Sequence, residues 1–195
     1  MSNVLLFSEL TDTNRAKLFE ILFADAQHKT FAYMPSSGVQ GSEAYITEWK
    51  DIAENQGASF ITIDNTSDSG EERAKLLGSD VLLISGGNTF RLLHNLRKSG
   101  LDKTIVEFSC KSGSIVAGFS AGALVFTPTI KVCDLPNFDK NLVGLKELDG
   151  LGIVDFEVFP HYDKALHEKA LNSYQKTTDN LVREITNEDY IFVNL

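Results

Sequence analysis

The sequence predicts an α/β fold: a doubly wound, mostly parallel sheet with helices on both faces. Short apolar runs alternate with longer segments whose apolar residues recur every three or four positions. The run at 81–84 is apolar throughout, which is typical of a central parallel strand buried on both faces. Strands that alternate with helices form parallel sheets covered on each side. We expect one domain over residues 1–195, since this length suits a single core.

The apolar runs and the helical patterns give the expected elements in chain order. Strands are expected at 4–7, 31–34, 60–63, 81–84, 115–117, 151–159 and 190–193. Helices are expected at 14–26, 42–56, 71–77, 90–100, 101–111 and 165–177, with a further helix starting at residue 121. In the second helix we assign Ala44, Tyr45, Ile46, Trp49 and Ile52 to the buried face.

The segment 151–159 alternates apolar and acidic residues. Val154, Phe156 and Val158 would face the core, and Asp155 and Glu157 would lie on a wetter face.

Composition excludes several classes of function. The formal charge of −9 argues against nucleic acid, whose phosphates need a basic surface. No apolar stretch approaches the ~20 residues of a membrane helix, and no signal-peptide pattern opens the chain. The two cysteines are too few for a disulfide framework. We expect a cytoplasmic protein, monomeric or homodimeric, that binds neither nucleic acid nor membrane.

The segment 114–124 predicts a serine at a sharp turn between a buried strand and a helix. Gly118 and Gly122 flank Ser120 in the order G-x-S-x-G, the nucleophile-elbow pattern. In such a turn the hydroxyl projects from the carboxyl end of the sheet, and the amide of Ala121 points to where an oxyanion would form. The same pattern also occurs in plain tight turns, but the strand before it and the helix after it favour a nucleophile.

A second glycine turn follows the strand at 81–84. Gly86-Gly87-Asn88-Thr89 lacks the dinucleotide fingerprint and the P-loop lysine, so we expect no cofactor. One interpretation is a tight turn whose Asn88 or Thr89 caps the next helix. The other is that the amide of Gly87 supplies a second oxyanion donor.

A serine nucleophile needs a base, and His161 is our candidate. It directly follows a predicted strand, so it should share the strand-end edge with Ser120 and the glycine turn. His28 and His94 lie in or beside helices, and His167 lies on a polar helix and is expected to be exposed. The group that orients the imidazole stays open at this point, the candidates being Asp134, Asp139, Asn187, Glu188 and Asp189. No cluster has metal-ligand spacing, so no metal is expected.

The motifs G-G-N-T-F at 86–90, G-F-S-A-G-A at 118–123 and P-H-Y at 160–162 together resemble the peptidase E family of serine peptidases. The resemblance covers most of the chain and implies a fold like the class I glutamine amidotransferases. It implies Ser120 as nucleophile, His161 as base and the amides of Gly87 and Ala121 as the oxyanion hole. Members of this family are described as α-aspartyl dipeptidases.

Two positions depart from the family. The family's third triad residue is a glutamate, and its position falls on Asn187 here, with Glu188 one residue later. We favour Asn187 on register, because an asparagine can also orient an imidazole.

The family's arginine-bearing segment after the histidine is also missing. The segment 166–176 holds no arginine, which puts a preference for aspartate in doubt. Lys169 or Lys176 could take its place only as a point charge.

We expect a serine peptidase that hydrolyses small peptides, including dipeptides with an N-terminal aspartate, through an acyl-enzyme on Ser120. The alternatives are a catalytically weak or silent ligand-binding relative and an amidase or esterase acting on another small substrate.

Overall fold

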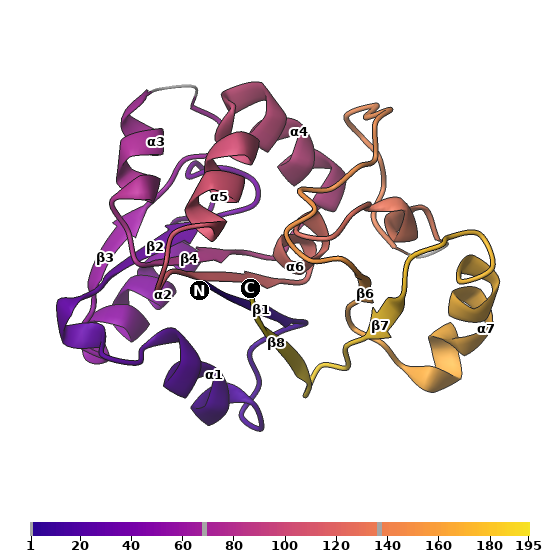
Figure 1. Cartoon of the computed structure of the whole chain (residues 1–195), viewed down its shortest axis with the longest axis horizontal. Helices are drawn as coiled ribbons and strands as arrows, with labels where there is room; N and C mark the ends of the chain where they lie inside the picture. The colour runs from indigo at the N-terminus through magenta and orange to yellow at the C-terminus, as the bar shows by residue number, and fades with distance from the viewer. Residues whose placement is uncertain (1, 68–69, 136–137) are drawn as a thin grey trace.

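A six-stranded sheet in the strand order β3-β2-β4-β5-β1-β8 runs through the centre of the protein (Figure 1). The computed structural model describes residues 2–67, 70–135 and 138–195. Its strands are β1 (Asn3–Phe7), β2 (Thr30–Met34), β3 (Ser59–Thr62), β4 (Val81–Ile84), β5 (Ile115–Phe119) and β8 (Tyr190–Asn194). The described pairings in this sheet are parallel, apart from the antiparallel pairing of β8 with β1. The predicted mostly parallel sheet is therefore confirmed.

Helices cover both faces of the sheet (Figure 1). One face packs against α1 (Arg15–Leu22) and α2 (Glu43–Asn55). The other packs against α3 (Gly70–Leu77), α4 (Thr89–Ser99), α5 (Leu101–Ser109) and α6 (Ala121–Val125). Short 3-10 turns lie at Ala26–His28 and Lys131–Asp134.

Successive residues of β1 show why both faces are apolar. Leu5 and Phe7 pack in the cluster under α1 and α2, whereas Val4 and Leu6 pack in the cluster on the opposite side. Side chains of a strand alternate between the two faces, so a strand covered on both sides must be apolar at every position. That is the physical reason why uninterrupted apolar runs predicted these strands.

The predicted strand at 151–159 is wrong for most of its length. Only β6 (Glu157–Phe159) is a strand, and it pairs in parallel with β7 (Val182–Glu184), a strand that the sequence analysis missed. These two strands form a separate small sheet, followed along the chain from β6 by α7 (Lys164–Tyr174). Figure 1 shows β6, β7 and α7 together at one end of the molecule.

Glu157 is fully buried, which corrects its assignment to a wetter face. Its carboxylate accepts hydrogen bonds from Tyr174 Oη at 2.5 Å, Thr178 Oγ1 at 2.6 Å and Asn180 Nδ2 at 3.0 Å. Burial, followed by the hydrogen bond to Glu157, raises the pKa of the Tyr174 phenol, so it stays protonated as a donor. Three donors explain how a carboxylate is accommodated in a core, because a buried polar group costs little when it is hydrogen-bonded.

We expect the Glu157→Leu substitution to lower the free energy of unfolding by about 2–4 kcal/mol, because it leaves the buried Tyr174 hydroxyl and the half-buried Thr178 and Asn180 donors without their acceptor. Urea denaturation followed by circular dichroism measures this change. Glu168→Leu, on the exposed surface of α7, is the matched control and should change stability by less than about 0.5 kcal/mol. Equal effects of the two substitutions would contradict a structural role for the Glu157 cluster.

The buried face of α2 also differs from expectation. Trp49 and Ala53 are buried, but Ala44 is exposed and Tyr45 is 64% exposed, so the first turn of α2 does not contribute to the core as expected. Within the described ranges, no helix is both long enough and apolar enough to cross a membrane.

Candidate active site

Ser120 lies at a sharp turn between β5 and α6. Its backbone has φ 50° and ψ −113°, a region that residues with a side chain rarely occupy. Its amide donates to the carbonyl oxygen of Phe7 at the end of β1, at 3.0 Å. The strand, the strained serine and the helix together form the nucleophile-elbow geometry that the sequence predicts.

The two glycines beside Ser120 are required by close backbone packing. A Cβ on Gly118 would lie 2.4 Å from the carbonyl carbon of Gly122. A Cβ on Gly122 would lie 2.2 Å from the carbonyl oxygen of Ile84 in β4. Helix α6 therefore sits directly against β5 and β4, which sets the position of the serine.

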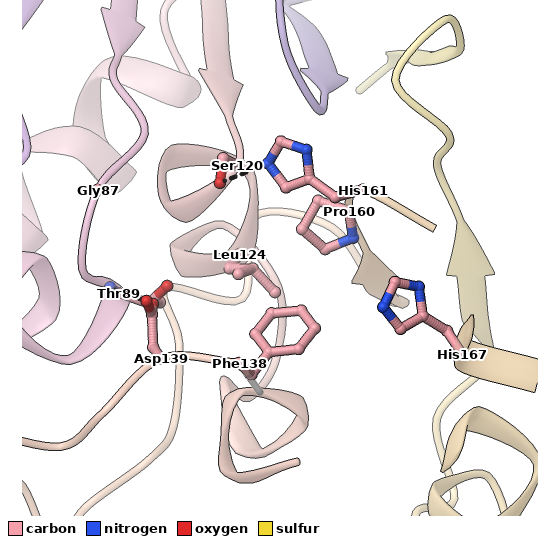
Figure 2. A pocket seen from close by; sticks show the side chains of 9 residues that line it. All are labelled: Gly87, Thr89, Ser120, Leu124, Phe138, Asp139, Pro160, His161 and His167. Atoms are coloured by element: carbon pink, nitrogen blue, oxygen red, sulfur yellow. Dashed lines mark hydrogen bonds between the residues drawn. The ribbon is translucent and has the colours of Figure 1, made fainter. Parts of the chain in front are cut away.

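His161 lies against Ser120. The Ser120 hydroxyl donates to His161 Nε2 at 3.0 Å, and Figure 2 shows the His161 ring facing the serine. His161 follows β6 in the small sheet, so the expectation that it ends a strand of the central sheet is wrong. Its own φ is 55°, which turns the side chain from the end of β6 back toward the elbow.

Ser8 joins the His161 segment to the central sheet. The amide of His161 donates to Ser8 Oγ at 2.8 Å, and Ser8 Oγ donates to the carbonyl oxygen of Ile185 at 2.9 Å. Ser8 is fully buried and directly follows β1, whose last residue, Phe7, binds the amide of Ser120. One strand end thus holds both the serine and the histidine. The sequence analysis missed Ser8, although a serine directly after a buried strand is a signal that could have found it.

Asn187, not Glu188, lies on the far side of the imidazole. His161 Nδ1 donates to Asn187 Oδ1 at 2.8 Å, which leaves Nε2 as the acceptor for the serine proton. The carbonyl oxygen of Asn187 accepts from Asn14 Nδ2 at 3.1 Å, and this bond orients the turn. Glu188 instead accepts from Thr11 Oγ1 at 2.9 Å.

We expect Asn187→Ala to lower kcat for peptide hydrolysis on the order of 10²-fold, since the imidazole loses the acceptor that sets its tautomer. Asn187→Asp should retain most of the activity, because a carboxylate accepts the same hydrogen bond. Steady-state kinetics of each variant measures this. The matched control is Glu188→Gln, which should change kcat by less than about threefold. A larger loss in Glu188→Gln than in Asn187→Ala would contradict this assignment.

The glycine turn after β4 lies next to the elbow. Gly87 has φ 146°, and a Cβ there would lie 2.1 Å from Ser36 Oγ, so the position requires glycine. Ser36 Oγ donates to the carbonyl oxygen of Gly86 at 2.6 Å, which holds the turn. In the described part of the chain, the amides of Gly87 and Ala121 donate to no protein acceptor. Asn88 caps α4, because its Oδ1 accepts from the amide of Arg91 at 2.9 Å, so the interpretation of the turn as a helix cap is confirmed.

A pocket of about 240 Å³ opens beside Ser120 and His161. Gly87 and Leu124 line it near the serine, and Phe138, Asp139 and His167 line it farther away (Figure 2). His167 is half-buried, so the expectation of an exposed side chain is wrong. Asp139 does not reach the imidazole either, because its carboxylate accepts from the amide of Thr89 at 2.6 Å.

The remaining reactive groups are the thiol of Cys133 and the acidic side chains. Cys133 is buried, and burial raises the pKa of its thiol well above the ordinary value, which disfavours a nucleophilic thiolate. Among the residues that the structure describes, no group of three or more histidine, cysteine, aspartate or glutamate side chains could hold a metal ion.

Comparison with known proteins identifies the family. A model of peptidase family S51 matches residues 4–194. The chain belongs to peptidase family S51. It is 32% identical over 199 residues to an uncharacterized peptidase of Listeria monocytogenes, covering 99% of this chain and 95% of the relative. It is 29% identical over 187 residues to a peptidase E of Citrobacter koseri, covering 93% and 77%. Membership makes the chain a serine-type peptidase.

Two solved structures agree with the fold described above. The crystal structure of a candidate peptidase E from Listeria monocytogenes EGD-e matches with a TM-score of 0.79 at 29% identity, over 99% of this chain and 94% of that one. A peptidase from an acI-B1 Actinobacterium matches with a TM-score of 0.70 at 20% identity, over 100% and 84%, which supports the fold alone. The predicted fold class is confirmed, and it is consistent with the class I glutamine amidotransferase-like architecture.

Proposed function

We propose that this S51 peptidase hydrolyses small peptides through an acyl-enzyme on Ser120. The observation that supports the proposal most is the continuous hydrogen-bonded chain from Ser120 Oγ through both nitrogens of His161 to Asn187 Oδ1. A hydroxyl, a base and an orienting acceptor in this order are the arrangement that serine hydrolases use.

The acylation step follows from that geometry. His161 Nε2 takes the proton of Ser120 as Oγ attacks the carbonyl carbon of the scissile peptide bond. The amides of Gly87 and Ala121 are the donors available to the oxyanion of the tetrahedral intermediate, and α6 adds the positive end of its backbone dipole. His161 then gives its proton to the leaving amine, and the acyl group remains on Ser120.

Deacylation repeats the sequence with water. His161 takes a proton from water, the resulting hydroxide attacks the ester carbonyl, and Ser120 leaves with the proton returned by His161. Asn187 holds the imidazole orientation in both halves, but it carries no charge. It therefore stabilises the imidazolium less than a carboxylate would, and we expect a slower enzyme than one with an acidic third residue.

The size of the pocket supports a small substrate. A volume of about 240 Å³ has room for roughly one residue beside the serine. The free thiols Cys110 and Cys133 suit a reducing compartment, in keeping with the proposal of a cytoplasmic enzyme.

The test combines a dipeptide panel with intact-protein mass spectrometry. Release of free amino acids should be measured for dipeptides whose N-terminal side chain is neutral, acidic or a carboxamide. A p-nitrophenyl ester should leave an acyl adduct that maps to Ser120. Adduct and turnover together support the proposal. An adduct from the ester with no peptide hydrolysis would favour the esterase alternative, and neither adduct nor hydrolysis would favour a silent ligand-binding relative.

A further inference from the structure

His167 places a hydrogen-bond donor of defined orientation in the pocket. Asp163, the residue that caps α7, donates its amide to His167 Nδ1 at 2.9 Å. Because Nδ1 is the acceptor in this bond, the proton of the neutral imidazole must lie on Nε2. The ring also packs against Phe159 at 5.2 Å and Tyr162 at 6.2 Å between centroids, which restricts its rotation.

The Nε2–H of His167 has no acceptor among the described residues. His167 lines the same pocket as Ser120 and His161, and Figure 2 shows its ring on the side of the pocket away from Asp139. An N–H donor that is oriented by its other nitrogen and faces a substrate pocket will favour a ligand that supplies an acceptor.

Asp139 is the acidic residue on the side of the pocket opposite His167. One carboxylate oxygen accepts from the amide of Thr89, and the other has no partner among the described residues. No lysine or arginine is among the described residues that line this pocket. A carboxylate on the substrate would therefore meet a fixed negative charge with no cation to offset it.

We infer that His167 is a specificity-determining residue, whose Nε2–H donates to the side-chain carbonyl of the substrate's acyl residue. The inference rests on the proposed peptidase function. An uncharged carboxamide suits this pocket, because its oxygen can accept from His167 and it brings no negative charge toward Asp139. The preferred substrates are then peptides with N-terminal asparagine or glutamine, ahead of those with aspartate or a purely alkyl side chain.

The test compares three dipeptides that share a C-terminal residue and begin with asparagine, leucine or aspartate, whose side chains have nearly the same size. In the unmodified enzyme, kcat/KM should be about tenfold higher for the asparagine peptide than for the leucine peptide, as one net hydrogen bond allows. The asparagine peptide should exceed the aspartate peptide by a similar factor or more.

Two substitutions of His167 separate binding from packing. His167→Phe keeps an aromatic ring between Phe159 and Tyr162 but removes the donor, and it should reduce the asparagine-to-leucine ratio to near one. His167→Gln restores a neutral N–H donor and should restore most of the ratio. Leu166→Ala, a change of a neighbouring exposed side chain, should leave the ratio unaltered. If His167 served in packing alone, its substitution would change kcat/KM for the asparagine, leucine and aspartate peptides by the same factor. The asparagine-to-leucine ratio would then stay the same.

A substitution at Asp139 tests the charge. Asp139→Asn retains an acceptor for the amide of Thr89 and removes the negative charge, so it should raise kcat/KM for the aspartate peptide relative to the asparagine peptide by about tenfold. If Ser120-dependent hydrolysis occurs but the ratios do not respond to His167→Phe, the inference is overturned and the proposed function stands. If no peptide is hydrolysed, both are overturned.

Discussion

Replacement of Ser120 by alanine is expected to lower kcat/KM for peptide hydrolysis by about 10⁵-fold, the largest effect on activity of any single change in this protein. Among the described residues of the elbow, Ser120 carries the hydroxyl that would form the proposed acyl-enzyme, and in the variant His161 would keep its orientation with no proton to accept. Hydrolysis that remains would come from water attacking a carbonyl bound near the amides of Gly87 and Ala121.

The fold should survive this change. Ser120 is half-buried, and its Oγ is hydrogen-bonded to His161 at the pocket surface. We therefore expect the free energy of unfolding to change by less than about 1 kcal/mol. Steady-state kinetics and urea denaturation of the same preparation measure both quantities. Ser173→Ala, on the exposed surface of α7, is the matched control and should leave activity unaltered. Residual activity above about 1% in Ser120→Ala would exclude Ser120 as the nucleophile.

Replacement of Gly122 by alanine is expected to have the largest effect on stability, at least about 3 kcal/mol. The new Cβ would lie 2.2 Å from the carbonyl oxygen and 2.8 Å from the carbonyl carbon of Ile84, and both atoms belong to the backbone of a central strand. No side-chain rotation relieves that contact, so α6 would have to move away from β4. The movement would also displace Ser120, which is two residues before Gly122.

Thermal and urea unfolding, together with the yield of folded protein, measure this effect. Gly70→Ala is the matched control, because a Cβ there meets nothing within 4 Å and Gly70 opens α3. It should change stability by no more than about 0.5 kcal/mol. If Gly122→Ala unfolds at the same urea concentration as the unmodified protein, the close packing of α6 on β4 does not hold in solution.

The elements predicted well from the sequence are those whose structure depends on residues close together in the chain. Strands β1, β2 and β4 are apolar at successive positions because both sides of the sheet are covered, and that pattern can be read without knowing the partners. The elbow is local as well, since a strand, two glycines and a helix start lie within a few residues. The register of the last strand favoured Asn187 over Glu188, and in the structure Asn187 Oδ1 lies 2.8 Å from His161 Nδ1.

The errors concern residues whose environment comes from distant parts of the chain. Glu157 alternates with apolar residues as an exposed side chain would, but Tyr174, Thr178 and Asn180 surround it with donors. Likewise, β6 was assigned to the central sheet because its partner, β7, is too short to recognise by pattern.

The sequence by itself thus determined the layered fold and the strained turn at Ser120, and it singled out His161 and Asn187 as neighbours of that serine. Only the tertiary structure decided that Ser8 at the end of β1 holds the backbone of His161, that Asp139 binds Thr89 and not the imidazole, and that His167 faces the pocket. The physical reason is the range of the interactions. Periodicity and turn geometry act over a few residues, whereas hydrogen bonds such as that between Ser8 and His161 join positions that no local pattern relates.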